Sequence, residues 1–220
     1  MSSVSRARGA TRLQFLPLVL VPLLVGVVIW LWLAAGSQPA GRGPVVQPTL
    51  NGAVMEPAVD LPPLAFDRTD GGTFTTADTR GRISLFYFGY THCVDICPVS
   101  LAQLSGVRRD LGKDAARVDF YFVTVDPARD TPTWMRGYVA NFPGIVGLTG
   151  SDTQLAQAQA AFNIEAERRD MGGDDYLMDH SAAVYLVNAS SQVALAYSYG
   201  TASEDILADL HRLVGELDRA

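Results

Sequence analysis

Apolar residues form one long run near the N-terminus of the chain and many shorter runs further along. The long run covers residues 15–35 and contains no charged side chain, and a helix of this length crosses a hydrocarbon core of about 30 Å. Arg6, Arg8 and Arg12 precede the run, and two tryptophans lie near its far end. We therefore predict a transmembrane anchor over 15–35, with residues 1–14 in the cytoplasm and the remaining chain outside.

A cleaved signal peptide is the alternative, with the small residues at 34–36 as its cleavage site. The apolar run is longer than the roughly 7–15 residues of a usual signal peptide, so we favour a retained anchor. Residues 36–60 are rich in proline, glycine and other small residues, which predicts a semi-extended tether. The remaining residues, 61–220, have the length of one domain.

The shorter apolar runs predict strands alternating with helices in this domain. The expected strands cover two short segments within 64–75, then 83–89, 118–125, 145–148, 183–188 and 193–199. Because strands and helices alternate over most of the chain, we expect a mixed α/β sheet flanked by helices.

Four helices are expected from their start signals. They begin at Pro98, at Pro132 after an N-cap Thr131, after Ser151 with Gln154 as its capping-box partner, and at Thr201 with Glu204. The second of these helices is expected to place a set of apolar side chains in the core, namely Trp134, Met135, Tyr138, Val139 and Phe142.

The charge balance excludes one class of partner. The formal net charge is −6, and it becomes −9 for the part of the chain beyond the anchor, because three arginines lie before it. An acidic domain argues against nucleic acid and favours a protein partner with a basic docking face.

All but one of the 17 basic residues are arginine, which is typical of a GC-rich bacterial genome. We therefore expect a bacterial inner-membrane protein with its domain in the periplasm.

The chain has two cysteines, Cys93 and Cys97, which follow the apolar run 83–89. Cys93 is expected in a polar loop, and Cys97 at the start of the helix that Pro98 opens. The positive end of a helix dipole favours the thiolate, the form that binds metal ions and attacks disulfides. A cysteine-bearing loop between a central strand and the next helix is typical of the thioredoxin-like fold, in which chemistry collects at the carboxyl ends of strands.

Two cysteines separated by three residues allow three interpretations. A structural disulfide would close a loop too short to add much stability, although an exported domain can oxidise its cysteines. A redox pair would use Cys93 as the attacking thiol and Cys97 as the resolving thiol. A soft-metal site would need at least one further ligand.

The three histidines differ as candidates for that ligand. His211 lies on the polar flank of the last helix and is expected at the surface. His92 adjoins Cys93, and neighbouring side chains in a loop usually point apart. His180 comes shortly before a predicted buried strand, where it is either a rim residue of the core or the third ligand. Two thiolates and one imidazole would suit Cu(I) and tolerate Cu(II), whereas zinc would need a fourth ligand, such as Asp95 or water.

Three segments of the chain carry a resemblance to a known family. They read FGYTHCVDICP at 88–98, VDPARDTP at 125–132 and YLMDHS at 176–181. With the N-terminal anchor and the spacing between the segments, the chain resembles the Sco (SCO/SenC) family of copper chaperones in cytochrome c oxidase assembly, over about residues 55–217.

The resemblance implies a thioredoxin-like domain that binds one copper ion, Cu(I) or Cu(II), through Cys93, Cys97 and His180. It also implies a role in maturing the binuclear copper site of cytochrome c oxidase subunit II, by copper delivery, by reduction of that subunit's cysteines, or both. Another periplasmic copper chaperone or a thiol reductase would be a further partner. Val94 departs from the family, which usually has proline there, and this departure leaves the loop less rigid.

Several other side chains near these segments have two interpretations. Asp95 and Asp130 either support the copper ligands and the docking partner or belong to turns, with Asp130 and Arg129 as a surface ion pair. Met171 and Met178 offer thioether sulfurs, but we expect them in loop or core packing.

Two hypotheses of different class follow from these residues. The first is a membrane-tethered copper chaperone, which needs His180. The second is a thiol–disulfide oxidoreductase, which needs Cys93 and Cys97 but not His180.

Overall fold

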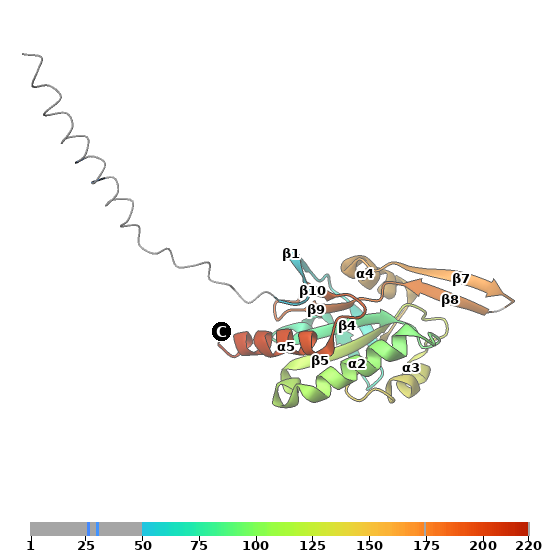
Figure 1. The fold of residues 1–220 in the computed structure, drawn as a ribbon. Helices are drawn as coiled ribbons and strands as arrows, with labels where there is room; N and C mark the ends of the chain where they lie inside the picture. Colours follow the sequence, from blue (N-terminus) through green and yellow to red (C-terminus); the bar gives the residue numbers. More distant parts are fainter. Residues whose placement is uncertain (1–25, 27–29, 31–49, 174, 220) are drawn as a thin grey trace, which may run out of the picture. The chain divides into compact units, whose positions relative to one another are not determined.

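The middle strands of a mixed sheet form the centre of the fold (Figure 1). β4 (Ile83–Gly89) pairs in parallel with β5 (Val118–Thr124), which pairs in parallel with β6 (Val146–Thr149). β9 (Val184–Val187) lies antiparallel on the other side of β4. Every residue of β4 is buried, so the predicted strand 83–89 is confirmed, and its near-continuous apolar sequence matches a strand covered on both faces.

Four further strands complete this eight-stranded sheet, in the order β1-β10-β9-β4-β5-β6-β2-β3. They are β1 (Ala53–Asp60), β2 (Ala65–Arg68), β3 (Thr73–Thr75) and β10 (Gln192–Tyr197). β2 and β3, the two short strands predicted within 64–75, form a hairpin whose turn contains Gly71 and Gly72 with φ of 107° and 77°. Glycine adopts these positive φ angles without the steric cost that other residues bear.

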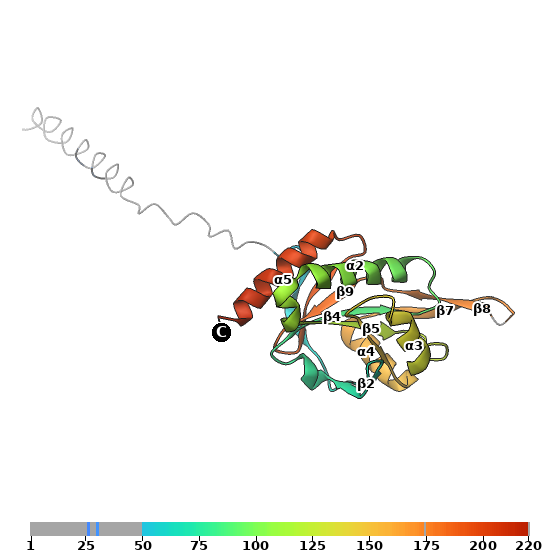
Figure 2. The ribbon, with the colours of Figure 1, turned by 90° about the horizontal axis from the view of Figure 1, so that it is seen from below.

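Helices cover both faces of the sheet. They are α2 (Ile96–Asp110), α3 (Pro132–Val139), α4 (Asp152–Phe162) and α5 (Ser203–Leu217), with short 3-10 helices η1 (Thr76–Thr79) and η2 (Gly112–Arg117). α2 and α5 lie side by side on one face, and α4 lies on the opposite face (Figure 2). The predicted mixed sheet flanked by helices is confirmed.

Alternate side chains of β4 build the two halves of the core. Phe86 and Phe88 point toward α4, and each ring lies 5.1 Å from that of Phe162. Tyr87 points toward α2, stacks on Phe122 at 6.2 Å, and brings its hydroxyl to 3.6 Å from the Cys97 sulfur. The period of two along a strand therefore places a tyrosine beneath the cysteine loop.

A separate two-stranded sheet projects beyond the main sheet (Figure 1). It consists of β7 (Ala166–Gly172) and β8 (Asp175–His180), paired antiparallel. This hairpin was not predicted from the sequence. His180 is the last residue of β8, so the hairpin decides where its imidazole lies.

The computed structural model describes residues 26, 30, 50–173 and 175–219. The predicted cytoplasmic segment 1–14, most of the predicted anchor 15–35 and residues 36–49 of the predicted tether lie outside the described residues. Among the described helices, none combines the length and the apolar character that crossing a bilayer requires. Residues 50–220 form one compact unit.

Residues 50–60 belong to this folded unit, which corrects the tether predicted over 36–60. β1 pairs with β10, and the backbone N–H groups of Asn51 and Gly52 donate to the buried Asp209 carboxylate at 2.9 and 3.0 Å. Tyr197 donates to the same carboxylate at 3.1 Å. β1 is an edge strand, and an edge strand tolerates the proline at position 57 that made this segment look like a linker.

Three smaller expectations also differ from the structure. α2 begins at Ile96, so Pro98 lies within its first turn rather than at its first position. The hydroxyl of Thr201 donates to the Ser198 carbonyl at 2.8 Å, and Ala202 is the N-cap of α5. Trp134, expected in the core, is 57% exposed. The other cap signals were correct, because the side chains of Thr131 and Ser151 accept hydrogen bonds at the starts of α3 and α4.

Candidate metal centre

The two cysteines lie where β4 ends and α2 begins. Gly89 is the last residue of β4, and Ile96 is the first residue of α2. Cys93 is in the loop and half-buried, whereas Cys97 is in the first turn of α2 and fully buried. Both are free thiols, and the Cys97 backbone N–H points at the Cys93 sulfur at 3.4 Å.

The third candidate ligand, His180, reaches the cysteines from the end of β8. Its Nε2 lies 3.4 Å from the Cys97 sulfur, and its Nδ1 lies 3.0 Å from the Ser181 carbonyl oxygen. A carbonyl oxygen only accepts, so the proton of a neutral imidazole sits on Nδ1 and the lone pair on Nε2. That tautomer presents the lone pair to the sulfurs, as a metal-binding histidine requires.

The donor atoms of Cys93, Cys97 and His180 all lie within 4.8 Å of one another. In a trigonal site, metal–ligand bonds of about 2.3 Å would place the three donors about 4 Å apart. Two thiolates and one imidazole form a soft donor set that suits Cu(I). Among the described residues, no carboxylate joins this group as a fourth ligand, which makes the set a poorer match for tetrahedral zinc.

The pKa values of the two cysteine thiols are shifted in opposite directions. A hydrogen bond from the Cys97 thiol lowers the pKa of Cys93, and the backbone N–H groups of Cys97 and Asp95 lower it further. The same hydrogen bond, together with burial, raises the pKa of Cys97. Cys93 is therefore the thiolate of the metal-free pair, and Cys97 carries the shared proton. Burial also raises the pKa of Tyr87, which keeps its hydroxyl as a donor toward Cys97.

Gly89 allows the close packing around Cys97. A Cβ atom at this position would lie 2.8 Å from the Cys97 sulfur and 2.9 Å from the Phe122 ring. Contacts of this length do not occur in real structures, so any larger residue would displace the sulfur or the ring.

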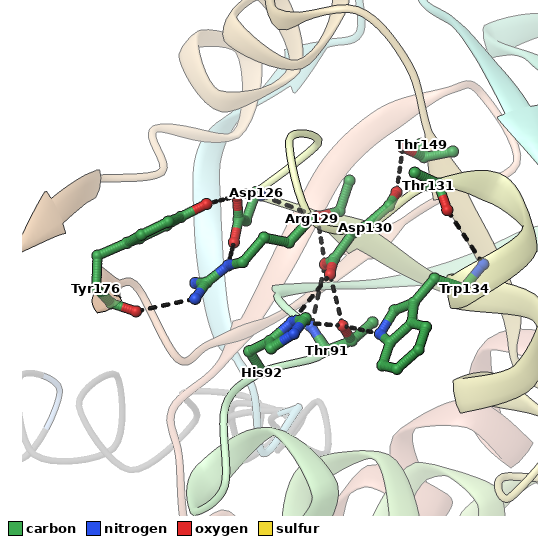
Figure 3. A network of polar contacts seen from close by, with 10 residues as sticks. Thr91, His92, Asp126, Arg129, Asp130, Thr131, Trp134, Thr149 and Tyr176 are labelled. Atoms are coloured by element: carbon green, nitrogen blue, oxygen red, sulfur yellow. Dashed lines mark hydrogen bonds and ion pairs between the residues drawn. The ribbon is translucent and has the colours of Figure 1, made fainter. Parts of the chain in front are cut away.

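Asp130 holds the cysteine loop through Thr91 (Figure 3). This carboxylate is fully buried and accepts from the Thr91 backbone N–H at 3.0 Å, the Thr91 hydroxyl at 2.5 Å and the Thr124 hydroxyl at 2.7 Å. Burial raises its pKa, while the hydrogen bonds from Thr91 and Thr124 oppose the shift. The described contacts link Asp130 to the cysteines through Thr91, two residues before Cys93.

The buried Asp126 and the partly buried Arg129 form a second group at the end of β5 (Figure 3). Arg129 pairs with Asp126, which is 3% exposed, so the surface ion pair expected between Arg129 and Asp130 is wrong. Tyr176 of β8 donates its hydroxyl proton to Asp126 at 2.8 Å, and Arg129 Nη1 donates to the Tyr176 carbonyl at 3.0 Å. These bonds connect the segment 126–130 to the hairpin that carries His180.

Other candidate residues lie apart from the three donors. His92 Nδ1 lies 3.2 Å from the Thr91 hydroxyl, and its ring stacks on Trp134 at 5.8 Å. Asp95 is the exposed N-cap position of α2 and makes no side-chain capping bond. Val94 is 92% exposed and faces solvent. His211 is at the surface as expected, 2.8 Å from Asp114.

A family profile described as SCO1/SenC matches residues 59–215. The chain belongs to the SCO1/SenC family. The mitochondrial SCO2 homologue of Mus musculus is 35% identical over 199 residues, which cover 88% of this chain and 77% of that protein.

Solved structures of other family members share the fold. ScoI of Bradyrhizobium japonicum, solved with copper bound, is 35% identical, with a TM-score of 0.66 over 70% of this chain and 99% of that one. Apo Sco1 of Thermus thermophilus is 29% identical, with a TM-score of 0.67 over 75% of this chain and 97% of that one. The expected resemblance to the Sco family and its thioredoxin-like fold is confirmed. Almost the whole of each solved chain is matched, so this fold forms in chains that consist of little besides the matched region.

The group that Tyr176 forms with Asp126 and Arg129 was not predicted from the sequence. Two signals were available. Gly172-Gly173 between polar alternating segments is a hairpin signal, and it would have placed Tyr176 and His180 on one strand. The joint occurrence of Asp126 and Arg129 at the end of a buried strand indicated a buried pair as readily as a turn.

Proposed function

We propose that this chain is a copper-binding chaperone that helps to mature cytochrome c oxidase, and that it carries one copper ion on Cys93, Cys97 and His180. The observation that carries the proposal is the convergence of these three donor atoms within 4.8 Å. A family member at 35% identity was solved with copper bound, which supports the same cargo here. Copper is the cargo of this protein rather than a resident cofactor.

The exposure of the three ligands suggests how the ion is passed on. Cys97 is fully buried, whereas Cys93 and His180 are only partly buried. An incoming cysteine or histidine of an acceptor would reach the ion from the side of Cys93 and His180. It would displace the neutral imidazole more readily than either thiolate, because Cu(I) prefers soft sulfur ligands. Cys97 would release the ion last.

The proposed setting follows from the N-terminal segment. A single-pass anchor over 15–35 would hold the domain on the periplasmic face of a bacterial inner membrane. Tethering would raise its effective concentration near a membrane-bound acceptor, for which we propose the binuclear copper site of cytochrome c oxidase subunit II. Another periplasmic copper chaperone would supply the ion.

Copper competition tests the proposal. The reduced fragment 50–220, which contains the whole compact unit, is titrated anaerobically with Cu(I) against a chelator. We expect one tightly bound ion, with at least a tenfold loss of affinity in His180→Ala and little change in His92→Ala. His92 is the matched control, because it adjoins Cys93 but lies outside the donor group. Equal affinity in the wild type and His180→Ala would reject the ligand assignment.

A second candidate function is thiol–disulfide exchange, which the unequal exposure of the two cysteines favours. The Cys93 thiolate would attack a partner's disulfide and form a mixed disulfide, releasing one partner thiolate. Cys97, after losing its proton, would then attack Cys93 and release the second thiolate, so the partner gains two electrons and this chain keeps a disulfide. A thiol reductase would have to restore the pair. Disulfide reduction that survives in His180→Ala, alongside copper binding that does not, would show that both activities exist.

A further inference from the structure

His180 belongs to a hairpin that is separate from the main sheet, so its position over the cysteines needs an explanation. A two-stranded ribbon is marginally stable by itself and is easily bent or displaced. Near its base, Glu165 and Ser181 are linked by two hydrogen bonds, at 3.0 and 3.2 Å, which hold the hairpin's two ends together. These bonds do not tie β8 to the cysteine loop.

Tyr176 provides the link between β8 and the body of the domain. Its side chain is buried on β8, four residues before His180 and therefore on the same face of the strand. Its hydroxyl and its carbonyl both bind the segment after β5, through Asp126 at 2.8 Å and Arg129 at 3.0 Å. The side chain and the backbone of Tyr176 are therefore both hydrogen-bonded to the same ion pair, Asp126 and Arg129.

Arg129 lies between the hairpin and the cysteine loop (Figure 3). Its guanidinium carbon lies 3.6 Å from the centre of the Tyr176 ring and 5.6 Å from that of the Tyr90 ring. Tyr90 directly follows β4, and its ring packs edge-on against His180 at 5.8 Å. A single planar cation therefore contacts β8 and the residue that begins the cysteine loop.

We propose that Arg129 is a positioning residue that holds β8, and with it His180, over Cys93 and Cys97. The proposal rests on the proposed function in that His180 is taken as a copper ligand. Arg129 contacts none of the three donor atoms in the described structure. Its planar guanidinium fits the Tyr176 ring, the Asp126 carboxylate and the Tyr176 carbonyl together, which the compact ammonium of lysine cannot reproduce.

Arg168 offers a matched control on the same tyrosine. Its guanidinium carbon lies 3.8 Å from the centre of the Tyr176 ring, almost as close as that of Arg129. Arg168 is itself a residue of β7 and pairs with Asp170 of the same strand. It therefore stacks on Tyr176 without linking the hairpin to the body of the domain.

The experiment compares Arg129→Lys with Arg168→Lys in the fragment 50–220, each with His180 present and in the His180→Ala background. Three quantities are measured: Cu(I) affinity by chelator competition, the midpoint potential of the dithiol, and amide hydrogen exchange of residues 175–180 without metal. For Arg129→Lys we expect about a tenfold loss of Cu(I) affinity, faster exchange along β8 and an unchanged potential. For Arg168→Lys we expect the wild-type values.

The His180→Ala background decides whether Arg129 acts through the histidine. If it does, Arg129→Lys has no further effect on Cu(I) affinity once His180 is gone. An equal loss in both backgrounds would overturn the proposal, as would unchanged exchange along β8. If the wild type binds Cu(I) without any need for His180, the proposed function fails. Even then, amide exchange along β8 that is faster in Arg129→Lys but not in Arg168→Lys would support the role of Arg129 in holding β8. Equal exchange in these two variants would reject that role.

Discussion

Replacement of Gly89 by alanine tests the packing around the buried cysteine. The added Cβ would lie 2.8 Å from the Cys97 sulfur, 2.9 Å from a Phe122 ring carbon and 3.3 Å from a Tyr87 ring carbon. All three neighbours are fully buried and have little room to move. Overpacking a tight core by one methyl group costs about 1–3 kcal/mol, so Gly89→Ala should lower the free energy of unfolding by that amount.

The expected shift is large enough to measure by thermal denaturation. For a domain of this size, each kcal/mol lowers Tm by about 2–4 °C, which gives a fall of between about 2 and 12 °C. The metal-free, reduced fragment 50–220 is the right sample, because a bound ion would add its own stabilisation. The same variant should also bind Cu(I) more weakly, since the cheapest relief moves the Cys97 sulfur away from β4.

Gly137→Ala is the matched control. Gly137 lies within α3, and a Cβ there would have no atom within 4 Å. Alanine is a better helix former than glycine, so this variant should stabilise the fragment by about 0.5–1 kcal/mol. A Tm for Gly89→Ala equal to or above that of the wild type would refute the reasoning. It would show that the strand end can shift and that Gly89 is not required for the approach of Cys97.

Two further predictions concern the thiols and the N-terminal strand. In the metal-free fragment, iodoacetamide should alkylate Cys93 much faster than Cys97, with a rate nearly constant between about pH 6 and 8, because the lowered pKa of Cys93 already makes it a thiolate there. A rate that rises about tenfold per pH unit, read by mass spectrometry, would contradict this. Asp209→Ala should destabilise the fragment in urea by about 1.5–3 kcal/mol, because it removes a buried charged acceptor of two backbone N–H groups, whereas Tyr197→Phe should cost about 1 kcal/mol. An Asp209→Ala midpoint equal to that of the wild type would show that these bonds do not hold residues 51 and 52.

The sequence by itself determined the central strands, two of the four predicted helix starts and the identity of the three candidate ligands. The apolar runs at β4 and β5 identified strands buried on both faces, since burial on both sides removes the alternation of an exposed sheet. The caps at Thr131 and Ser151 are local, so adjacent residues were enough to find them. Cysteine and histidine were informative because few other residues form a soft metal site.

Only the tertiary structure decided which polar residues serve the site. Asp126 and Asp130 are four residues apart and chemically alike, yet one holds the β8 hairpin and the other holds the cysteine loop. Arg129 looked like half of a surface ion pair, and Trp134 looked like a core residue. Their roles depend on partners about 40–50 residues away, Tyr176 for Arg129 and Thr91 for Trp134, and local spacing does not encode such pairings.

The position of His180 also depends on contacts between residues that are far apart in the sequence. Its residue type made it a candidate, but its distance from Cys97 is set by a hairpin that spans residues 166–180 and by the ion pair that fastens Tyr176. The edge strand β1 was hidden for a related reason, because its pairing with β10 lies more than 130 residues away along the chain. Local patterns in a sequence indicate which side of an element is buried and how adjacent residues cap its ends. Contacts between distant elements arise only when the whole chain packs, and in this protein those contacts bring the three candidate ligands together.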